Sequence, residues 1–472
     1  MKTVLALCYL ATWAAIPHLL LLKKRPAATL AWLWAILFIP FLGPLVYGFF
    51  GTDRLKRRRL KYRTLFSAKP SGQRIPAGAT DEATAALIRN LMGRERQFLQ
   101  LLSRINQLPV SSVTALRVLL DAKEFYPALE ERIQQAKHHI HLEFYIWRGD
   151  ETGRRFLRLL TEAAQRGVTV RLLLDGVGSF SLRPARLKAF RKAGGRFSWF
   201  QSLDPKRNRF LLNLRNHRKL QIVDGASAFV GGMNIGQEHE GRDPRYGHWR
   251  DVQVEVGGAV VRELQEVFAD DWFFATGEKI PEEPASVHGA AYPMHVLVAG
   301  ADRANEPMSK SIVSLINEAT TRVWIATGYF VPDDVLLAAL ELAAHRGVDV
   351  RLLVAEKNNH PWLVIAGRSY YGELLAAGVR IFEYSAGTNH AKIAVADEHW
   401  AMVGSANLDY RSMRLNFELN LLVRSPEHNA ALAGILEHDF RISQEIDLAT
   451  FARRPFHRRF AEAALRPLSP ML

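Results

Sequence analysis

Apolar residues follow two different patterns along the chain. Near the amino terminus they form continuous runs, because residues 3–22 and 27–50 are uncharged and mostly apolar. Each run is long enough to cross a hydrocarbon layer of roughly 30 Å as a helix. The link at residues 23–26 is too short for a domain, so the pattern predicts a two-helix transmembrane hairpin. A cleavable signal peptide is the alternative for the first run, but a second apolar run follows at once.

The rest of the chain alternates short apolar runs with amphipathic stretches, and this pattern repeats. Residues 166–173 and 346–353 differ at one position, and each places a helix-ending glycine before a strand. Upstream, residues 140–145 and 323–328 are a second pair of matching strands. In each half the pattern therefore predicts a strand, a helix, a second strand, a second helix and then a β-hairpin. This order is typical of an α/β layer fold with helices on a mixed sheet.

These patterns divide the chain into four parts. Residues 1–63 are the predicted transmembrane hairpin with a basic juxtamembrane segment. Residues 64–115 are a predicted connector, loop-like at first and then helical. The first half runs from 116 to 285, where a Pro-rich stretch predicts a linker, and the second half runs from 286 to 472.

Positive charge is concentrated at the amino terminus. The formal net charge is +15, and residues 1–63 hold eleven Lys or Arg against one acid, so the body is only mildly basic. This favours an anionic membrane surface over nucleic acid as the partner, since a nucleic-acid enzyme is expected to carry the charge on its body. Seven positive charges follow the second apolar run against three between the runs, which predicts a cytoplasmic body. Cys8 is the only cysteine, so no intrachain disulfide can form.

One motif occurs twice. The spacing His-x-Lys-x4-Asp appears in both halves, and an asparagine follows seventeen residues after each histidine in a turn of small residues. A single His-x-Lys pair is usually part of a surface strand. Two copies with matching spacing predict one site built where the two halves meet. The duplicated set is His217, Lys219, Asp224 and Asn234 in the first half, and His390, Lys392, Asp397 and Asn407 in the second.

These side chains suit chemistry on a phosphate diester. A neutral histidine attacks phosphorus and holds the phosphoryl group covalently, and a protonated histidine gives a proton to the leaving alkoxide. The two histidines must then begin in opposite protonation states, which unequal surroundings can arrange. The lysines and asparagines would hold the phosphoryl oxygens. Asp224 and Asp397 precede turn residues, so we expect them to be structural members of the motif.

The paired motif resembles the signature of the phospholipase D superfamily, and within it the bacterial cardiolipin synthases. The resemblance implies two touching halves related by a pseudo-twofold axis. Three departures lie beside the motifs: Asn389 where Leu is usual, Gly328 where Pro is usual, and Tyr410 where Asn is common. They bear on fine specificity rather than on the reaction class. The strings that carry the resemblance are residues 215–219, 249–251, 271–278, 367–371 and 404–422.

A membrane-bound phosphatidyltransferase is the activity that this resemblance implies. One phosphatidylglycerol would give its phosphatidyl group to another, making cardiolipin and glycerol through a phosphohistidine. His217 would be the nucleophile, and His390 the acid and then the base. Asp251 and Glu418 follow the histidine of their own half by 34 and 28 residues, and each would orient it through Nδ1. We expect no cofactor, no nucleic acid partner, and a multi-pass location in the bacterial inner membrane; the oligomeric state is left open.

Several alternatives stay open. Nothing local separates water from a lipid hydroxyl as acceptor, so a phospholipase D-type hydrolase, or a transferase using another alcohol, also fits. A nuclease and an inactive membrane scaffold fit less well. His139, His141 and Glu143 share a strand face in a pattern that also occurs in metal sites, but without an evident partner ligand we expect no metal. Residues 206–214 combine basic and apolar side chains, which indicates either a lipid-surface contact or a buried strand.

Overall fold

The computed structural model describes residues 15–21, 26–39, 42–47, 82–200, 215–281, 289–300 and 306–471. The chain divides into two compact units. Residues 1–68 and 204–213 form the first unit, and the rest of the chain forms the second. Three features singled out from the sequence lie outside the described residues: Cys8, the basic residues 54–63 and the stretch 206–214.

The described residues of the amino-terminal unit are helical at 15–21 and in the short helices α2 (Pro26–Phe38) and α3 (Leu42–Val46). Leu19, Ile36 and Tyr47 form a small buried cluster within it. No helix in the described ranges is both long enough and apolar enough to cross a membrane. The predicted two-span hairpin is therefore not seen there, and most of its first span falls outside the described residues.

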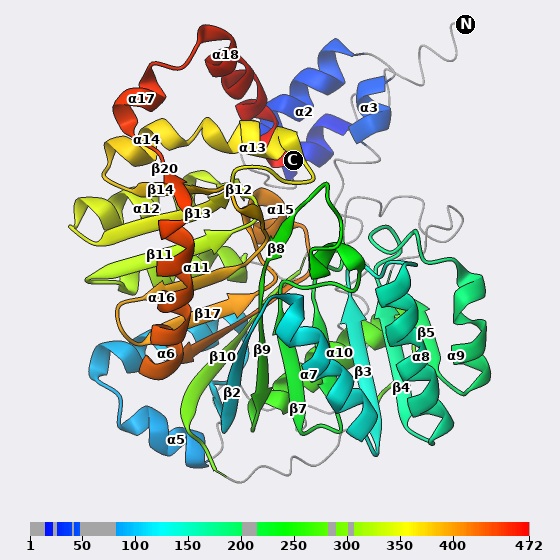
Figure 1. Ribbon diagram of the computed structural model, residues 1–472. Helices are drawn as coiled ribbons and strands as arrows, with labels where there is room; N and C mark the ends of the chain where they lie inside the picture. The colour runs from blue at the N-terminus through cyan, green and yellow to red at the C-terminus, as the bar shows by residue number, and fades with distance from the viewer. Residues whose placement is uncertain are drawn as a thin grey trace, which may run out of the picture. The chain divides into compact units, whose positions relative to one another are not determined.

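The two sequence repeats form two mixed sheets with the same strand order (Figure 1). The first sheet has the order β2-β9-β7-β6-β3-β4-β5. The second has β10-β19-β17-β16-β11-β13-β14, extended by β1 at one edge and β20 at the other. In each sheet three neighbouring strands, β3, β4 and β5 or β11, β13 and β14, run parallel. The predicted α/β fold with two similar halves is confirmed.

The strands have the following bounds. The first sheet contains β2 (Ala115–Leu120), β3 (His139–Phe144), β4 (Thr169–Leu174), β5 (Arg196–Trp199), β6 (Leu220–Val223), β7 (Ser227–Gly231) and β9 (Val252–Gly257). The second contains β1 (Ser111–Val113), β10 (Tyr292–Ala299), β11 (Arg322–Thr327), β13 (Asp349–Ala355), β14 (Arg380–Tyr384), β16 (Ile393–Ala396), β17 (Trp400–Gly404), β19 (Glu418–Arg424) and β20 (Ser443–Glu445). Two small pairs, β8 (His248–Arg250) with β15 (Gly387–Asn389) and β12 (Phe330–Val331) with β18 (Leu408–Asp409), complete the set.

Helices cover both faces of each sheet. On the outer faces lie α7 (Asp121–Gln135), α8 (Glu151–Gln165) and α9 (Lys188–Lys192) in the first half, and α6 (Gly93–Asn106), α11 (Pro307–Glu318), α12 (Asp334–His345), α13 (Pro361–Arg368) and α14 (Tyr371–Ala376) in the second. On the inner faces, α10 (Val260–Thr276) and α16 (Pro426–Arg441) each also contact a strand of the other sheet. The other α-helices of the body are α5 (Glu82–Arg89), α15 (Tyr410–Arg414), α17 (Leu448–Ala452) and α18 (Phe456–Leu465).

Matching local signals start and stop the repeated helices. Asp150 caps α8 by accepting a hydrogen bond from a backbone N–H of the first turn, and Asp333 caps α12 in the same way. Gly167 and Gly347 follow these helices with φ of 92° and 84°. Side chains with a Cβ are strained at such angles, so glycine ends each helix and turns the chain into the next strand.

The predicted connector contributes to the second half. Phe98, Leu99 and Leu102 on α6 are buried in the outer core of that half. Residues 111–113 then form β1, which pairs with β10 at the edge of the second sheet. The chain crosses at Thr114 and enters the first sheet at β2. A shared core of apolar side chains from both sheets joins the halves into one body.

Candidate active site

Two short backbone pairings tie the halves together beside the motifs. β8 runs parallel to β15, and the His390 N–H donates to the Arg250 carbonyl at 2.8 Å. At the matching place in the repeat, Asn216 bridges to Phe417, and the His217 N–H donates to the Phe417 carbonyl at 2.9 Å. Each pairing sets the histidine of one half next to the acidic residue of the other.

The histidine–carboxylate pairs are therefore crossed between the halves. His217 Nδ1 lies 3.0 Å from Glu418 Oε2, and His390 Nδ1 lies 2.6 Å from Asp251 Oδ2. The pairing within each half expected from the sequence spacing is wrong, because the inter-half backbone pairs decide which side chains meet. With Nδ1–H donating to a carboxylate, Nε2 of each histidine is the nitrogen left for chemistry.

The two lysines are buried beside the histidines. Lys219 Nζ donates to the His217 carbonyl at 2.6 Å, and Lys392 Nζ donates to the His390 carbonyl. An ammonium group has three N–H donors, so this bond sets its position without exhausting its capacity to bind an anion. Both motif copies thus present a histidine ring and a fixed ammonium group.

Burial lowers the pKa of all four groups. The pKa of His217 falls to about 4 through burial, opposed by Glu418. Burial, followed by Lys392 and Lys219, holds the pKa of His390 well below its usual value. The pKa values of Lys219 and Lys392 fall to about 7 and about 8, mainly through burial. Since the charges acting on His390 come from both halves, the structure brings the two motif copies into one site.

The two carboxylates differ in their protonation. Ser405 Oγ donates to Glu418 at 2.6 Å and Asn416 Nδ2 at 3.3 Å. Burial works to raise the pKa of Glu418, but the charge and hydrogen bond of His217, with help from Lys219 and Ser405, outweigh it and lower the pKa. Burial raises the pKa of Asp251 to about 6, although Lys392 opposes the shift. Glu418 is thus firmly ionised, and Asp251 is poised near neutral pH.

An asparagine directly before each motif histidine fixes the local backbone. Asn216 Oδ1 accepts the Arg218 N–H at 3.1 Å, and Asn389 Oδ1 accepts the Ala391 N–H at 3.2 Å. These side-chain turns hold the histidine between them in a set conformation. Asn216 Nδ2 also donates to the buried Glu143, which places that carboxyl beneath the motif. Asn389, which stands where Leu is usual in the family, therefore gives the second half the same side-chain turn that Asn216 forms in the first half.

The two motif asparagines lie in different environments. Asn234 Oδ1 accepts the Ile146 N–H at 3.0 Å. Asn407 is buried, and its Oδ1 has no hydrogen-bond partner among the described residues. A Cβ on Gly328 would lie 3.3 Å from His390 Cα and 3.4 Å from Asn407 Oδ1, so that asparagine adjoins the second histidine.

The two motif aspartates lie at the turn end of their hairpins, beyond strands β6 and β16. Asp224 and Asp397 have φ of 53° and 49°. The Asp224 carboxylate accepts three backbone N–H groups of residues 137–139 at 2.8 Å. Asp397 accepts the backbone N–H groups of Thr320 and Thr321 in the same manner. These bonds support the structural interpretation of both residues.

On β3, His141 is hydrogen-bonded to protein groups and its ring stacks on that of His139. Arg171 donates to His141 Nε2 at 3.1 Å, and Gln265 Oε1 lies 3.0 Å from its Nδ1. The rings of His139 and His141 stack at 4.5 Å. No group of three possible metal ligands is present in the described part of the chain. The absence of a metal requirement stays a prediction.

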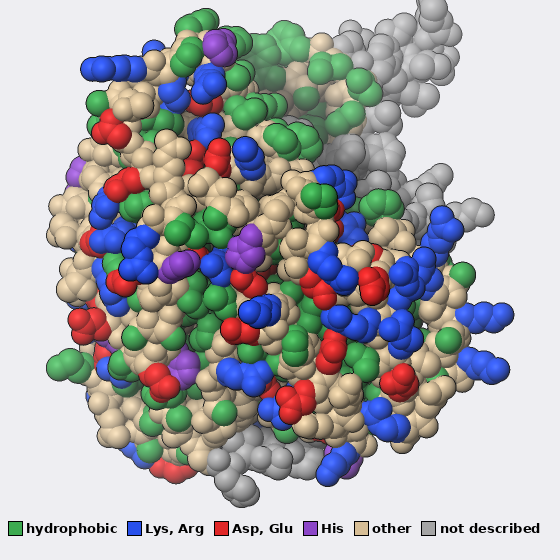
Figure 2. Space-filling model, viewed as in Figure 1, with side chains coloured by type: hydrophobic (Ala, Val, Ile, Leu, Met, Phe, Trp, Pro, Cys, Tyr) green, Lys and Arg blue, Asp and Glu red, His purple; other side chains and the backbone are tan. Residues whose placement is uncertain are grey.

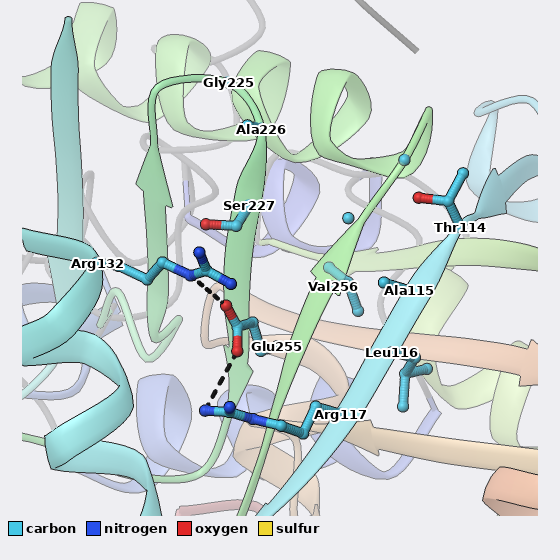
Figure 3. Close-up of a pocket in the computed structure, with 12 residues that line it drawn as sticks. Thr114, Ala115, Leu116, Arg117, Arg132, Gly225, Ala226, Ser227, Glu255 and Val256 are labelled. Carbon is cyan, nitrogen blue, oxygen red and sulfur yellow. Dashed lines mark hydrogen bonds and ion pairs between the residues drawn. The ribbon is translucent and has the colours of Figure 1, made fainter. Parts of the chain in front are cut away.

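A cavity of about 500 Å³ lies at the turn end of the first hairpin, and Figure 3 shows the residues that line it. Arg117 and Arg132 both form ion pairs with Glu255 there, at 3.3 and 2.6 Å. Most lining residues come from α7, β2, β7, β9 and the turn after Asp224, and they include neither a motif histidine nor a motif lysine. This cavity is separate from the candidate active site.

Several ring side chains border the histidines and were not assigned a role from the sequence. Tyr145 lies with its ring 4.9 Å from that of His217. Around His390 are Trp249 at 5.3 Å, His239 at 6.2 Å and Tyr329 at 6.3 Å. The six extra residues between His217 and Asp251 are the sequence signal that could have pointed to His239.

Family models match most of the chain. Residues 129–272 and 312–440 match the model described as "Cardiolipin synthase, PLD-like domain", and residues 10–51 match "Phospholipase_D-nuclease N-terminal". The chain belongs to the cardiolipin synthase family of phospholipase D-like proteins. The two matched stretches include both copies of the motif and both acidic partners.

Relatives in this family align with nearly the full chain. A cardiolipin synthase of Geobacillus thermodenitrificans is 38% identical over 95% of this chain and 90% of its own length. A probable cardiolipin synthase of Bacillus subtilis is 32% identical over 99% of this chain and 93% of its own. The crystal structure of phosphatidylserine synthase from Haemophilus influenzae covers 80% of this chain and 100% of that chain, with a TM-score of 0.61 at 15% identity. That last likeness shows the fold alone.

Proposed function

We propose that this chain is a cardiolipin synthase that transfers a phosphatidyl group from one phosphatidylglycerol to a hydroxyl of another and releases glycerol. Family membership supports the substrate class. The observation that carries the mechanism is the pair of crossed histidine–carboxylate contacts with unequal proton affinity, beside two buried ammonium groups.

In the first step, Nε2 of His217 attacks phosphorus and the bond from phosphorus to the glycerol oxygen breaks. Glu418 accepts a hydrogen bond from Nδ1–H of His217 and fixes the tautomer in which Nε2 carries the lone pair. Lys219, Lys392, Asn234 and Asn407 hold the phosphoryl oxygens in this proposal. The leaving oxygen takes a proton from His390.

The His390–Asp251 pair supplies that proton. Asp251 takes up a proton near pH 6, and because it shares a short hydrogen bond with His390, that proton belongs to the pair. A bound phosphodiester adds a negative charge that favours the protonated form further. The His217–Glu418 pair gains its extra proton only near pH 4, so His217 stays neutral and nucleophilic.

In the second step, the hydroxyl oxygen of the acceptor phosphatidylglycerol attacks phosphorus and the phosphorus–nitrogen bond to His217 breaks. The hydroxyl proton passes to His390, which restores the protonated pair. Two phosphatidylglycerol molecules thus give one cardiolipin and one glycerol, with no net change in protons.

The amino-terminal segment is proposed as the membrane anchor, with residues 1–63 as hairpin and basic segment, 64–115 as connector, and 116–285 and 286–472 as the halves. Supporting this, α2 exposes large apolar side chains, including Trp34 and Phe38 at 61% and 66%. The two apolar runs support two spans in the bacterial inner membrane, and the charge distribution supports a cytoplasmic body. A reporter fused after Leu472 should show cytoplasmic activity, and extracytoplasmic activity would contradict this topology.

The surface of the body supports a lipid rather than a nucleic acid substrate. On the face shown in Figure 2, acidic side chains lie among the basic ones over most of the surface, and Lys and Arg are more frequent at the right-hand edge. Ten of the fifteen net positive charges belong to residues 1–63. A nucleic-acid channel would gather positive charge on the catalytic body.

Product analysis tests the function directly. Purified full-length protein is added to detergent micelles that contain phosphatidylglycerol as the sole phospholipid. We expect cardiolipin and glycerol in equal amounts. Phosphatidic acid and glycerol would identify a hydrolase, and a phosphatidyl ester formed only when another alcohol is supplied would identify a different transferase.

A further inference from the structure

The six residues that the first half carries in excess lie in the stretch between β7 and β8. This stretch forms a 3₁₀ turn at Gln237–Glu240 and places His239 beside the second catalytic pair. The His239 ring lies 6.2 Å from that of His390 and 4.8 Å from that of Trp249. The second half lacks the insertion, so His217 has no counterpart of His239.

His239 and Trp249 are buried with their polar atoms unsatisfied. His239 is 2% exposed and Trp249 6%. Both ring nitrogens of His239 and Nε1 of Trp249 have no hydrogen-bond partner among the described residues. Buried polar atoms nearly always have a partner, because leaving them unpaired costs free energy. Three such atoms on two touching rings beside one catalytic histidine indicate a place that a polar ligand completes.

The chemistry of these atoms matches a hydroxyl group. Burial, with His390 and Lys219 adding to it, holds the pKa of His239 well below its usual value, so the ring is neutral. A neutral imidazole has one N–H donor and one nitrogen acceptor, and the indole adds one donor. A hydroxyl both donates and accepts. A phosphate has no proton for the imidazole acceptor, so these atoms suit it less well.

We propose that His239 and Trp249 bind the free hydroxyl groups of the glycerol headgroup. This inference rests on the proposed function, in which the headgroup leaves and arrives on the His390 side. The acceptor oxygen takes the position of the leaving oxygen, so one subsite serves both steps. His239 and Trp249 thereby set the preference for a polyhydroxy headgroup.

A ligand that can reach the catalytic histidines can also reach this subsite. His217 and His390 are themselves only 8% and 6% exposed. A phosphodiester that reaches His390 would therefore also meet the rings beside it. The centroid of the Trp249 ring lies 5.3 Å from that of His390, so Trp249 is the nearer of the two subsite rings to His390.

The test compares two donors present together in the same mixed micelles: phosphatidylglycerol and phosphatidylpropanol, whose headgroup carries no free hydroxyl. Phosphatidylglycerol supplies the acceptor hydroxyl for both donors. Release of the headgroup alcohol gives kcat/KM for each, and their ratio is the headgroup preference. We expect the wild type to prefer phosphatidylglycerol. His239→Phe should lower this preference about tenfold, since it removes hydrogen bonds made only to the free hydroxyls. Trp249→Phe, which loses one donor, should lower it less.

Two further variants control for folding. His239→Gln keeps a donor and an acceptor and should retain most of the preference. His295→Phe removes another buried histidine, bonded to Ser103 and Val296 in the second sheet, and should leave the preference unchanged. Thermal unfolding of each variant checks that it is folded.

The outcomes separate this inference from the proposed function. A folded His239→Phe or Trp249→Phe that loses the same factor on both donors, or keeps the wild-type preference, would overturn the headgroup subsite. Cardiolipin is measured in the same samples. A wild type that releases glycerol but makes no cardiolipin would defeat the proposed function, while the headgroup preference could still be scored from alcohol release.

Discussion

The His217–Glu418 and His390–Asp251 pairs share one geometry and have different neighbours. Two residues before Glu418 stands Asn416, which donates to it, and two residues before Asp251 stands Trp249, which contacts His390 instead. Ser405 donates to Glu418, and the matching position in the first half is Gly232. A Cβ at Gly232 would lie 2.2 Å from Asp251 Oδ1, so the carboxylate occupies the space that a side chain would need.

These neighbours separate the roles of two copies of one motif. A carboxylate with several donors stays ionised and holds its histidine in one neutral tautomer. A buried carboxylate with fewer donors takes up a proton near neutral pH and shares it with its histidine. The asymmetry continues above the rings, where Tyr145 contacts His217 while the corresponding position beside His390 is Gly328.

The carboxylates give the sharpest contrast between the pairs. Asp251→Asn should lower turnover of phosphatidylglycerol by roughly 10²–10⁴-fold, because the leaving oxygen loses its proton source. A phosphatidyl ester of an acidic phenol needs no proton, so this variant should lose less on that donor. Glu418→Gln disturbs the nucleophile and should lose a comparable factor on both donors. Steady-state rates with the two donors test this difference. If both variants lost the same factor on each donor, the two pairs would not have the different roles proposed here.

The pH dependence follows from the signs of the pKa shifts. As pH rises, the Asp251–His390 pair releases its proton near 6 and Lys219 loses its charge near 7, so kcat/KM should decline through this range. His217 stays neutral down to about 4 and does not limit the reaction above that. Because the anionic substrate favours protonation, the decline of kcat should lie at higher pH than that of kcat/KM. A kcat/KM that is flat from pH 5 to 9 would contradict this assignment.

Exchanging the neighbours of the carboxylates should have smaller effects. Ser405→Ala removes a hydrogen bond to an ionised group and should slow phosphoenzyme formation by about tenfold. Gly232→Ala forces the Asp251 carboxylate to move and should cost about 1–3 kcal/mol in the free energy of unfolding. Single-turnover kinetics measure the rate of phosphoenzyme formation in Ser405→Ala, and denaturant unfolding measures the stability of Gly232→Ala. A Gly232→Ala variant with wild-type stability would show that Asp251 has more freedom than the structure gives it.

Chelation should have the smallest effect. Two buried ammonium groups supply positive charge at the phosphate, so exhaustive chelation should change turnover by less than about twofold. Zwitterionic detergent controls for ions that act on the lipid surface. A large loss that one divalent ion restores would show that a metal takes part.

Much of the fold could be predicted from local patterns. The matching strings at residues 166–173 and 346–353 each encode a helix end, a glycine and a buried strand, and the structure has these elements in both halves. The role of β1 could not be predicted in this way, because an edge strand of three residues carries no periodicity of its own. Its place in the second sheet depends on tertiary pairing with β10.

The site was predictable as a set of residues and not as a set of contacts. The duplicated spacing indicated His217, Lys219 and their repeats, since these depend on sequence alone. Counting along the chain could not show that the acidic partners cross over, because β8 and β15 come together only in the folded body. His239 carries no motif, and only its place beside His390 gives it significance.

The central claim is that His217 carries the phosphatidyl group and His390 moves the protons. His390→Ala leaves the nucleophile and removes the base for the second step. Given a phosphatidyl ester of an acidic phenol, this variant should accumulate a phosphatidyl adduct on the peptide that contains His217, detected by mass spectrometry at neutral or basic pH. An adduct on His390 in His217→Ala, with none on His217 in His390→Ala, would contradict the assignment.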